Sequence, residues 1–99
     1  MTVLDERLAF SSREACDAAG LTYRVVDYWV RMGAVTPSIP AAGSGSQRRW
    51  SIRDVDRLTR IGSVIRRAEQ AGLSVSAAAV ADIWAALEAG DPWTFTVTA

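Results

Sequence analysis

The 99-residue sequence has no histidine and no lysine, and it has a single cysteine, Cys16. Without histidine or lysine the thiol has no obvious base to activate it, so we expect no enzymatic activity. A lone cysteine excludes an internal disulfide, and with histidine missing the usual nitrogen and sulfur metal ligands are lacking. We therefore expect no cofactor and no metal site, and we place Cys16 in the core.

Long apolar runs are also missing. No stretch reaches the ~18 apolar residues that a membrane span needs, and the acidic pair Asp5-Glu6 near the start is unlike a signal peptide. Apolar residues still make up 49% of the chain, which is too many for a disordered protein. We expect one cytoplasmic domain over residues 1–99, with its core in 10–88 and no membrane contact.

The net charge of zero hides an uneven distribution of charge. Residues 24–67 contain nine arginines and three aspartates, whereas the remaining segments contain two arginines and eight acidic residues. A basic block with acidic flanks is typical of a small protein that binds nucleic acid with one surface.

Capping residues and glycines predict two short helices early in the chain. Ser11 and Glu14 form a capping-box pattern before a helix over residues 12–19, which ends at Gly20. A second helix is expected over 23–32. Two short helices joined by a tight turn containing glycine form a helix-turn-helix, whose second helix enters the DNA major groove.

The second helix separates apolar and polar side chains. Residues three and four positions apart share a face, so one side packs and the other offers hydrogen-bonding groups. We expect Asp27 to orient Arg24 or Arg31 rather than to read a base. For Arg31, pairing with Asp27 at i, i+4 and binding to a phosphate both stay open. The polar side consists of Arg24, Asp27, Tyr28 and Arg31.

Residues 34–49 contain too many prolines, glycines and serines for a helix and favour a small β-hairpin, or wing, with its tip at 43–46. Trp50 is expected to anchor this hairpin in the core. Two arginines beside the tip are expected to stay free for the DNA backbone or the minor groove. The polar residues after the tip are Gln47, Arg48 and Arg49.

Two further helices complete the predicted fold. The third begins at Ser51 with Asp54 and runs to about residue 71, and the fourth begins at Ser74 or Ser76. The alternating tail 91–99 has a strand pattern. On the third helix Arg53 is the best candidate for a phosphate contact, and Arg57, Arg60 and Arg67 line the same face. We place Trp29, Trp50 and Trp84 in the core.

This order of elements resembles the DNA-binding domain of the MerR family of transcription regulators, over about residues 10–88. The matching segments are SSREACDAAGLTYRVVDYWVRMGAV, GSGSQRRWSIRDVDRL and IRRAEQAGLSVSAAAV. The resemblance implies a mainly α winged helix-turn-helix of about four helices, with a β-hairpin wing and, from the tail pattern, a short C-terminal strand. It also implies that Arg24 contacts a base edge or a phosphate, and Tyr28 a phosphate.

Two departures from the family pattern bear on function. Asp27 stands where the family commonly has a basic residue, which changes the expected groove contacts there. The sequence ends just after Gly90 plus a short tail, so we expect neither the long dimerisation helix nor an effector domain, as in small excisionase-like members.

Three functions are compatible with this sequence. The first is a transcription regulator that binds double-stranded DNA as a homo-dimer or cooperative array, without a small-molecule effector. The second is an architectural protein, either an excisionase-type recombination factor or a nucleoid protein that coats DNA. The third is a protein–protein adaptor that has lost DNA binding.

Overall fold

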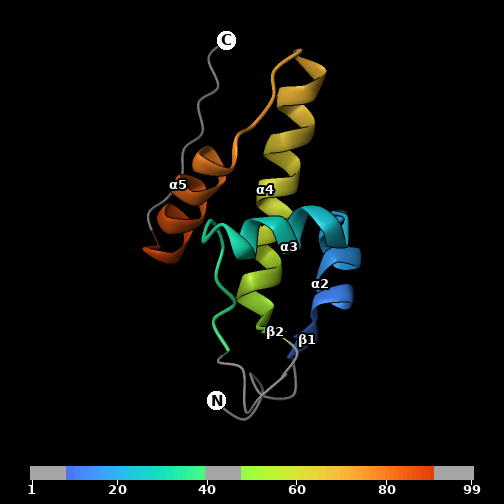
Figure 1. Ribbon diagram of the computed structural model, residues 1–99, viewed down its shortest axis with the longest axis vertical. Helices are drawn as coiled ribbons and strands as arrows, with labels where there is room; N and C mark the ends of the chain where they lie inside the picture. The colour runs from blue at the N-terminus through green and yellow to red at the C-terminus, as the bar shows by residue number, and fades with distance from the viewer. Residues whose placement is uncertain (1–8, 40–47, 91–99) are drawn as a thin grey trace.

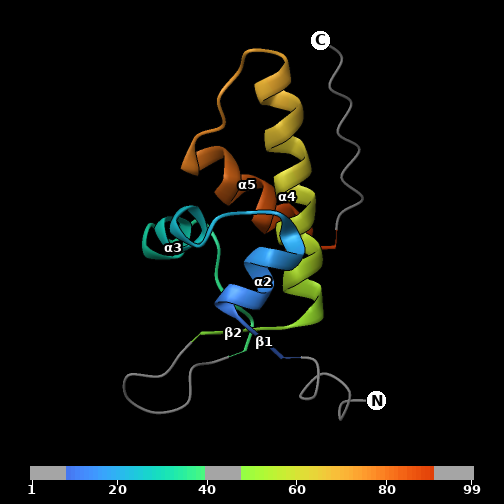
Figure 2. The ribbon, with the colours of Figure 1, turned by 90° about the vertical axis from the view of Figure 1, so that its right-hand side faces the viewer.

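The computed structural model describes residues 9–39 and 48–90, which form four helices and a two-stranded sheet (Figure 1). The long helix α4 is the axis of the molecule; α2 and α3 lie on one side of it and α5 on another (Figures 1 and 2). The predicted mainly α fold is confirmed. In chain order the elements are β1 (Phe10–Ser11), α2 (Ser12–Ala19), α3 (Tyr23–Arg31), β2 (Arg49–Trp50), α4 (Ile52–Gln70) and α5 (Ala77–Glu88).

The helices begin where short polar side chains can bind the free amides of the first turn. Ser11 and Glu14 form the predicted capping box, in which each side chain accepts a hydrogen bond from the other residue's backbone N–H, at 3.1 and 2.9 Å. Ser51 and Asp54 repeat this arrangement at α4, and Ser76 caps α5. Gly20 ends α2 with a φ of 71°, a conformation that glycine adopts without strain.

The core lies where α2, α3 and α5 meet α4. Trp50 is fully buried, and its ring meets the ring of Trp84 edge-to-face, with 6.4 Å between the centroids. Its indole N–H donates to the Ser12 hydroxyl at 2.9 Å, so the buried polar atom is satisfied. Trp29 is buried as well, which confirms the packing roles predicted for these three tryptophans.

Cys16 is buried in this core, as predicted from the usual burial of a free cysteine. Burial raises the pKa of the thiol, and the nearby charge of Asp17 acts in the same direction. The neutral thiol is therefore favoured, which fits a packing role.

The small sheet forms the base of the wing. β1 pairs antiparallel with β2, Phe10 opposite Trp50 and Ser11 opposite Arg49, and Ile39 bridges Arg49 on the other side. The chain thus leaves the sheet at Ile39 and returns at Arg49, which confirms the base of the predicted hairpin. The wing tip 43–46, Gln47 and the strand expected in 91–99 lie outside the described residues.

None of the described helices combines the length and the apolar character that crossing a bilayer would require.

Candidate nucleic-acid interface

α3 has one packed side and one exposed polar side, as its sequence predicts. Val26 and Trp29 are buried against the core. Arg24 and Arg31 are exposed, and Tyr28 keeps 46% of its surface accessible. The Thr22 hydroxyl accepts from the Val25 N–H at 3.2 Å and fixes the start of the helix. The exposed side therefore carries two guanidinium groups and a phenol on a rigid element.

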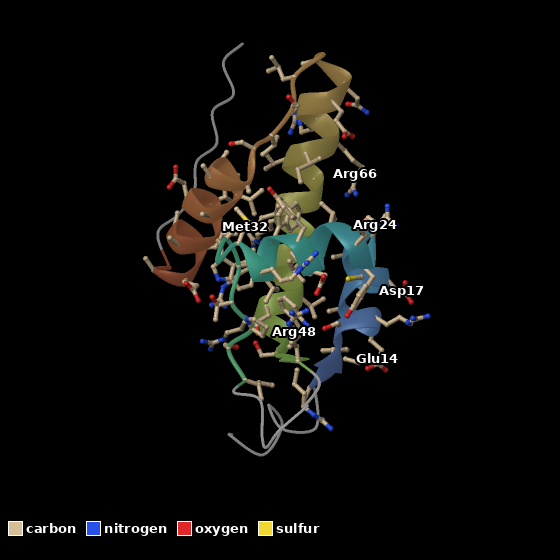
Figure 3. All side chains as sticks on the ribbon, in the orientation of Figure 1. Glu14, Asp17, Arg24, Met32, Arg48 and Arg66 are labelled. Atoms are coloured by element: carbon tan, nitrogen blue, oxygen red, sulfur yellow. The ribbon has the colours of Figure 1, made fainter. Side chains whose placement is uncertain are left out.

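Arg24 and Met32 mark the two ends of α3 in Figure 3, and Arg48 lies below the helix, toward the short sheet. Arg48 precedes β2 directly, so the sheet register determines where its side chain starts. The fold thus brings the wing base next to the polar side of α3.

Asp27 lies at the centre of this arrangement. Its Oδ1 accepts a hydrogen bond from Arg48 Nη1 at 2.7 Å, and its Oδ2 pairs with Arg31 Nε at 3.0 Å. The hydrogen bond from Arg48, with the nearby charges of Arg31 and Arg48, lowers the pKa of the Asp27 carboxyl although partial burial opposes this. The carboxylate is therefore ionised at neutral pH.

The predicted pairing of Asp27 with Arg31 is confirmed. The expectation that Arg48 of the wing stays free is wrong. Asp27 pairs with Arg31, one turn along the helix, and among the described residues no ion pair joins it to Arg24. Arg48 was expected to stay free, but its guanidinium is bound to the carboxylate of Asp27 in the middle of α3. A contact across 21 residues cannot be read from helical spacing.

Two more arginines lie around a shallow surface depression next to the wing base. Arg49 projects from β2, and Arg53 lies in the first turn of α4, where the sequence placed it; both are exposed. Neither forms an ion pair with another described residue, and the same holds for Arg24. The depression is lined by Ala9, Ser38, Ile39, Arg49, Ser51, Ile52, Arg53 and Arg57.

Asp54 has a larger role than the sequence suggested. It is completely buried, and its Oδ2 accepts from the backbone N–H of Ser38 at 2.9 Å, the Ser38 hydroxyl at 2.7 Å and the Ser51 N–H at 2.9 Å. Its Oδ1 accepts from Arg57 at 2.9 Å. Asp54 therefore both caps α4 and joins it to the strand segment that enters the wing.

Arg57 departs from the predicted row of solvent-facing arginines. Its side chain turns inward to Asp54, and its guanidinium carbon lies 5.5 Å from the centroid of the Trp84 ring. The i, i+3 spacing of Asp54 and Arg57 was the available clue. Arg60 instead pairs with Asp56 at 3.0 Å in an exposed ion pair.

These features agree with the comparisons to known proteins. Residues 10–80 match the family of MerR HTH regulatory proteins. The chain belongs to the MerR family. Regulators of this type bind double-stranded DNA through the helix-turn-helix.

Curated relatives support the same assignment. The chain is 43% identical over 75 residues to proteins named uncharacterized HTH-type transcriptional regulators, from Mycobacterium bovis and two strains of Mycobacterium tuberculosis. The matched region is 75% of this MerR-family chain and 32% of each relative, so the chain spans about a third of their length.

Proposed function

We propose that this chain is a DNA-binding transcription regulator that places α3 in the major groove and the wing, residues 43–50, on the backbone or in the minor groove. The observation that carries the proposal is the hydrogen bond between Asp27 and Arg48. It brings the wing base to the polar side of α3, so that one surface offers both parts to a duplex.

Each exposed residue of α3 makes a different contact with the DNA, according to its position on the helix. Arg24, at the exposed N-terminal end, binds a guanine edge with two hydrogen bonds or binds a phosphate; a bidentate contact discriminates between bases by ~1–3 kcal/mol. Tyr28 donates its hydroxyl to a phosphate. Arg31 contacts a phosphate while Asp27 holds its Nε, because a guanidinium has five N–H donors.

The wing and the start of α4 supply backbone contacts. Arg48 uses Nη1 toward Asp27 and keeps its other donors for the DNA. Arg49 and Arg53 flank the wing base as exposed cations without a carboxylate partner among the described residues. Gln47, which lies outside the described residues, is proposed as a further polar contact to the DNA.

Because a single winged unit makes few contacts, two or more copies act together on the DNA, as a homo-dimer or as a cooperative array. A dimer doubles the contacts and reads two half-sites at a fixed spacing. An array distributes the same contacts along the duplex.

The test is a salt titration of DNA affinity by fluorescence anisotropy, on duplexes of several lengths and sequences. With about four to six phosphate contacts per protomer, log K should fall against log[salt] with a slope of roughly −4 to −5. Tight binding to a few sites, independent of duplex length, supports the regulator. Cooperativity that grows with length and ignores sequence supports an architectural coat instead. Absence of binding at low salt refutes the proposal and favours the adaptor.

Two alanine variants with the same charge change show whether the surface is the one proposed. Arg24→Ala removes a cation from α3, and Arg60→Ala removes one from the exposed pair with Asp56. Arg60 lies two turns further along α4 than Arg53 and lines a depression with Arg53 and with Glu88 at the C-terminal end of α5. Arg24→Ala should weaken binding by about tenfold or more, and Arg60→Ala by less than about twofold. Equal losses would mean that net charge alone drives binding.

A further inference from the structure

Asp27 is the only acidic residue of α3, and it lies in the middle of the surface proposed to face DNA. A carboxylate at this place repels phosphates and lowers affinity for any duplex. Asparagine or alanine would be less costly for DNA affinity alone. The contacts of Asp27 indicate which structural role its charge has besides this repulsion.

Each oxygen of Asp27 binds a different arginine. Oδ2 binds Arg31 within α3, whereas Oδ1 binds Arg48, which lies 21 residues further along the chain at the wing base. Within residues 9–39 and 48–90 this is the one side-chain hydrogen bond between α3 and the wing base. The carboxylate therefore connects the two parts that would enter or follow the grooves.

The pair with Arg48 is more shielded than an ordinary surface ion pair. The side chain of Asp27 is 24% exposed and that of Arg48 is 32% exposed, whereas Arg31 keeps 67%. A partly shielded hydrogen-bonded ion pair at 2.7 Å restricts the rotamers of a long side chain. Arg48 is thus held in one direction before any DNA arrives.

From this geometry we infer that Asp27 is a positioning residue: through Arg48 it fixes the wing base relative to α3 and sets the sequence selectivity of the protein. The inference rests on the proposed function. A helix and a wing base held at a fixed separation fit duplexes whose groove geometry matches that separation, and a wing base that is not held accepts more duplexes. Selectivity is the difference in binding free energy between the preferred duplex and other duplexes. Asp27 can therefore raise the selectivity while it lowers the affinity for both kinds of duplex.

Removal of the Asp27 charge should therefore change the affinities for two kinds of duplex by different factors. Affinity for an unrelated sequence should rise or stay constant, because a repulsive charge is lost. Affinity for the preferred sequence should gain less or fall, because Arg48 is no longer held. If Asp27 only repelled phosphates, removing its charge would raise both affinities by the same factor. If its ion pair only stabilised the fold, removing the charge would change only the unfolding equilibrium.

The experiment measures the ratio of affinities for two duplexes of equal length at one salt concentration. The preferred duplex is selected from a randomised pool by the wild-type protein, and the second duplex is its scrambled form. We expect Asp27→Asn to lower the ratio by about tenfold, the size of one lost base discrimination. Arg48→Ala should lower it similarly, and the double variant should lower it no further, since both changes break one contact.

Asp56→Asn is the matched control, because it removes an exposed carboxylate from the ion pair with Arg60 and should leave the ratio unchanged. Circular dichroism of each variant checks that it is folded, and Arg48→Ala tests the same contact from the wing side. A ratio unchanged by both Asp27→Asn and Arg48→Ala overturns the inference. Equal binding of both duplexes by the wild type also overturns it while DNA binding stands. Failure of the wild type to bind either duplex refutes the proposed function itself.

Discussion

The hydroxyl of Ser38 donates to the buried carboxylate of Asp54 at 2.7 Å, and the backbone N–H of Ser38 donates to the same oxygen at 2.9 Å. Ser38 directly precedes Ile39, where the chain leaves the small sheet, and Asp54 lies in the first turn of α4. A single buried side chain therefore attaches the wing base to the longest helix. Since Asp54 also binds Arg57, which lies over Trp84, the same cluster extends toward α5.

Asp54→Asn should lower the free energy of unfolding by about 3 kcal/mol or more. The change leaves the shielded guanidinium of Arg57 without its anion and replaces an acceptor by a donor among N–H groups. Urea denaturation followed by circular dichroism measures the loss. Asp56→Asn, two residues further along the same helix, breaks an exposed pair and should cost less than about 1 kcal/mol. Losses of similar size in the two variants would contradict the role assigned to Asp54.

Gly62→Val should destabilise the contact between α2 and α4. Gly62 is buried, and a Cβ there would lie 3.1 Å from the carbonyl oxygen of Ala19 and 3.4 Å from Leu21 Cδ2. Valine adds two more carbon atoms at this close approach, so we expect a loss of about 2–3 kcal/mol. The neighbouring change Ser63→Val, at an exposed position, should cost less than about 1 kcal/mol. Thermal unfolding of the two variants tests this, and equal melting temperatures would show that α2 can move away without cost.

The stability contributed by Glu14 should depend on pH. The hydrogen bonds from the backbone N–H and the hydroxyl of Ser11 lower the pKa of the Glu14 carboxyl below its ordinary value of 4.5. A carboxyl whose folded-state pKa is lowered stabilises the fold when ionised, and this contribution is lost as the pH falls from about 4.5 through the folded-state pKa. Glu14→Gln should therefore be less stable than the wild type at neutral pH and equally stable at strongly acidic pH. Denaturation midpoints at several pH values measure the difference, and a constant difference would refute this account of the cap.

Much of the fold follows from patterns only three or four residues long. Ser11 with Glu14 and Ser51 with Asp54 are local capping boxes, and Gly20 ends α2, so the helix ends were predictable to within about a residue. Helical spacing also predicted which side of α3 packs, because the buried Val26 and Trp29 lie three positions apart.

The contacts that organise the candidate interface were not predictable in this way. Arg48 meets Asp27 across 21 residues, and Ser38 meets Asp54 across 16. Helical or strand periodicity predicts which face of an element is buried, but it does not predict which loop packs against that element. Arg57 shows the same limit, because its position suggested a solvated arginine until the location of the Trp84 ring was known.

We propose that α3 and the wing base together form the DNA-binding surface. The most direct test is to titrate ¹⁵N-labelled protein with a short duplex at low salt and map the backbone amide shifts. We expect the largest changes in residues 22–32 and 48–53, and little change at Asp56, Arg60 and Glu88. Changes centred on those three residues, or no change at the lowest salt, would contradict it.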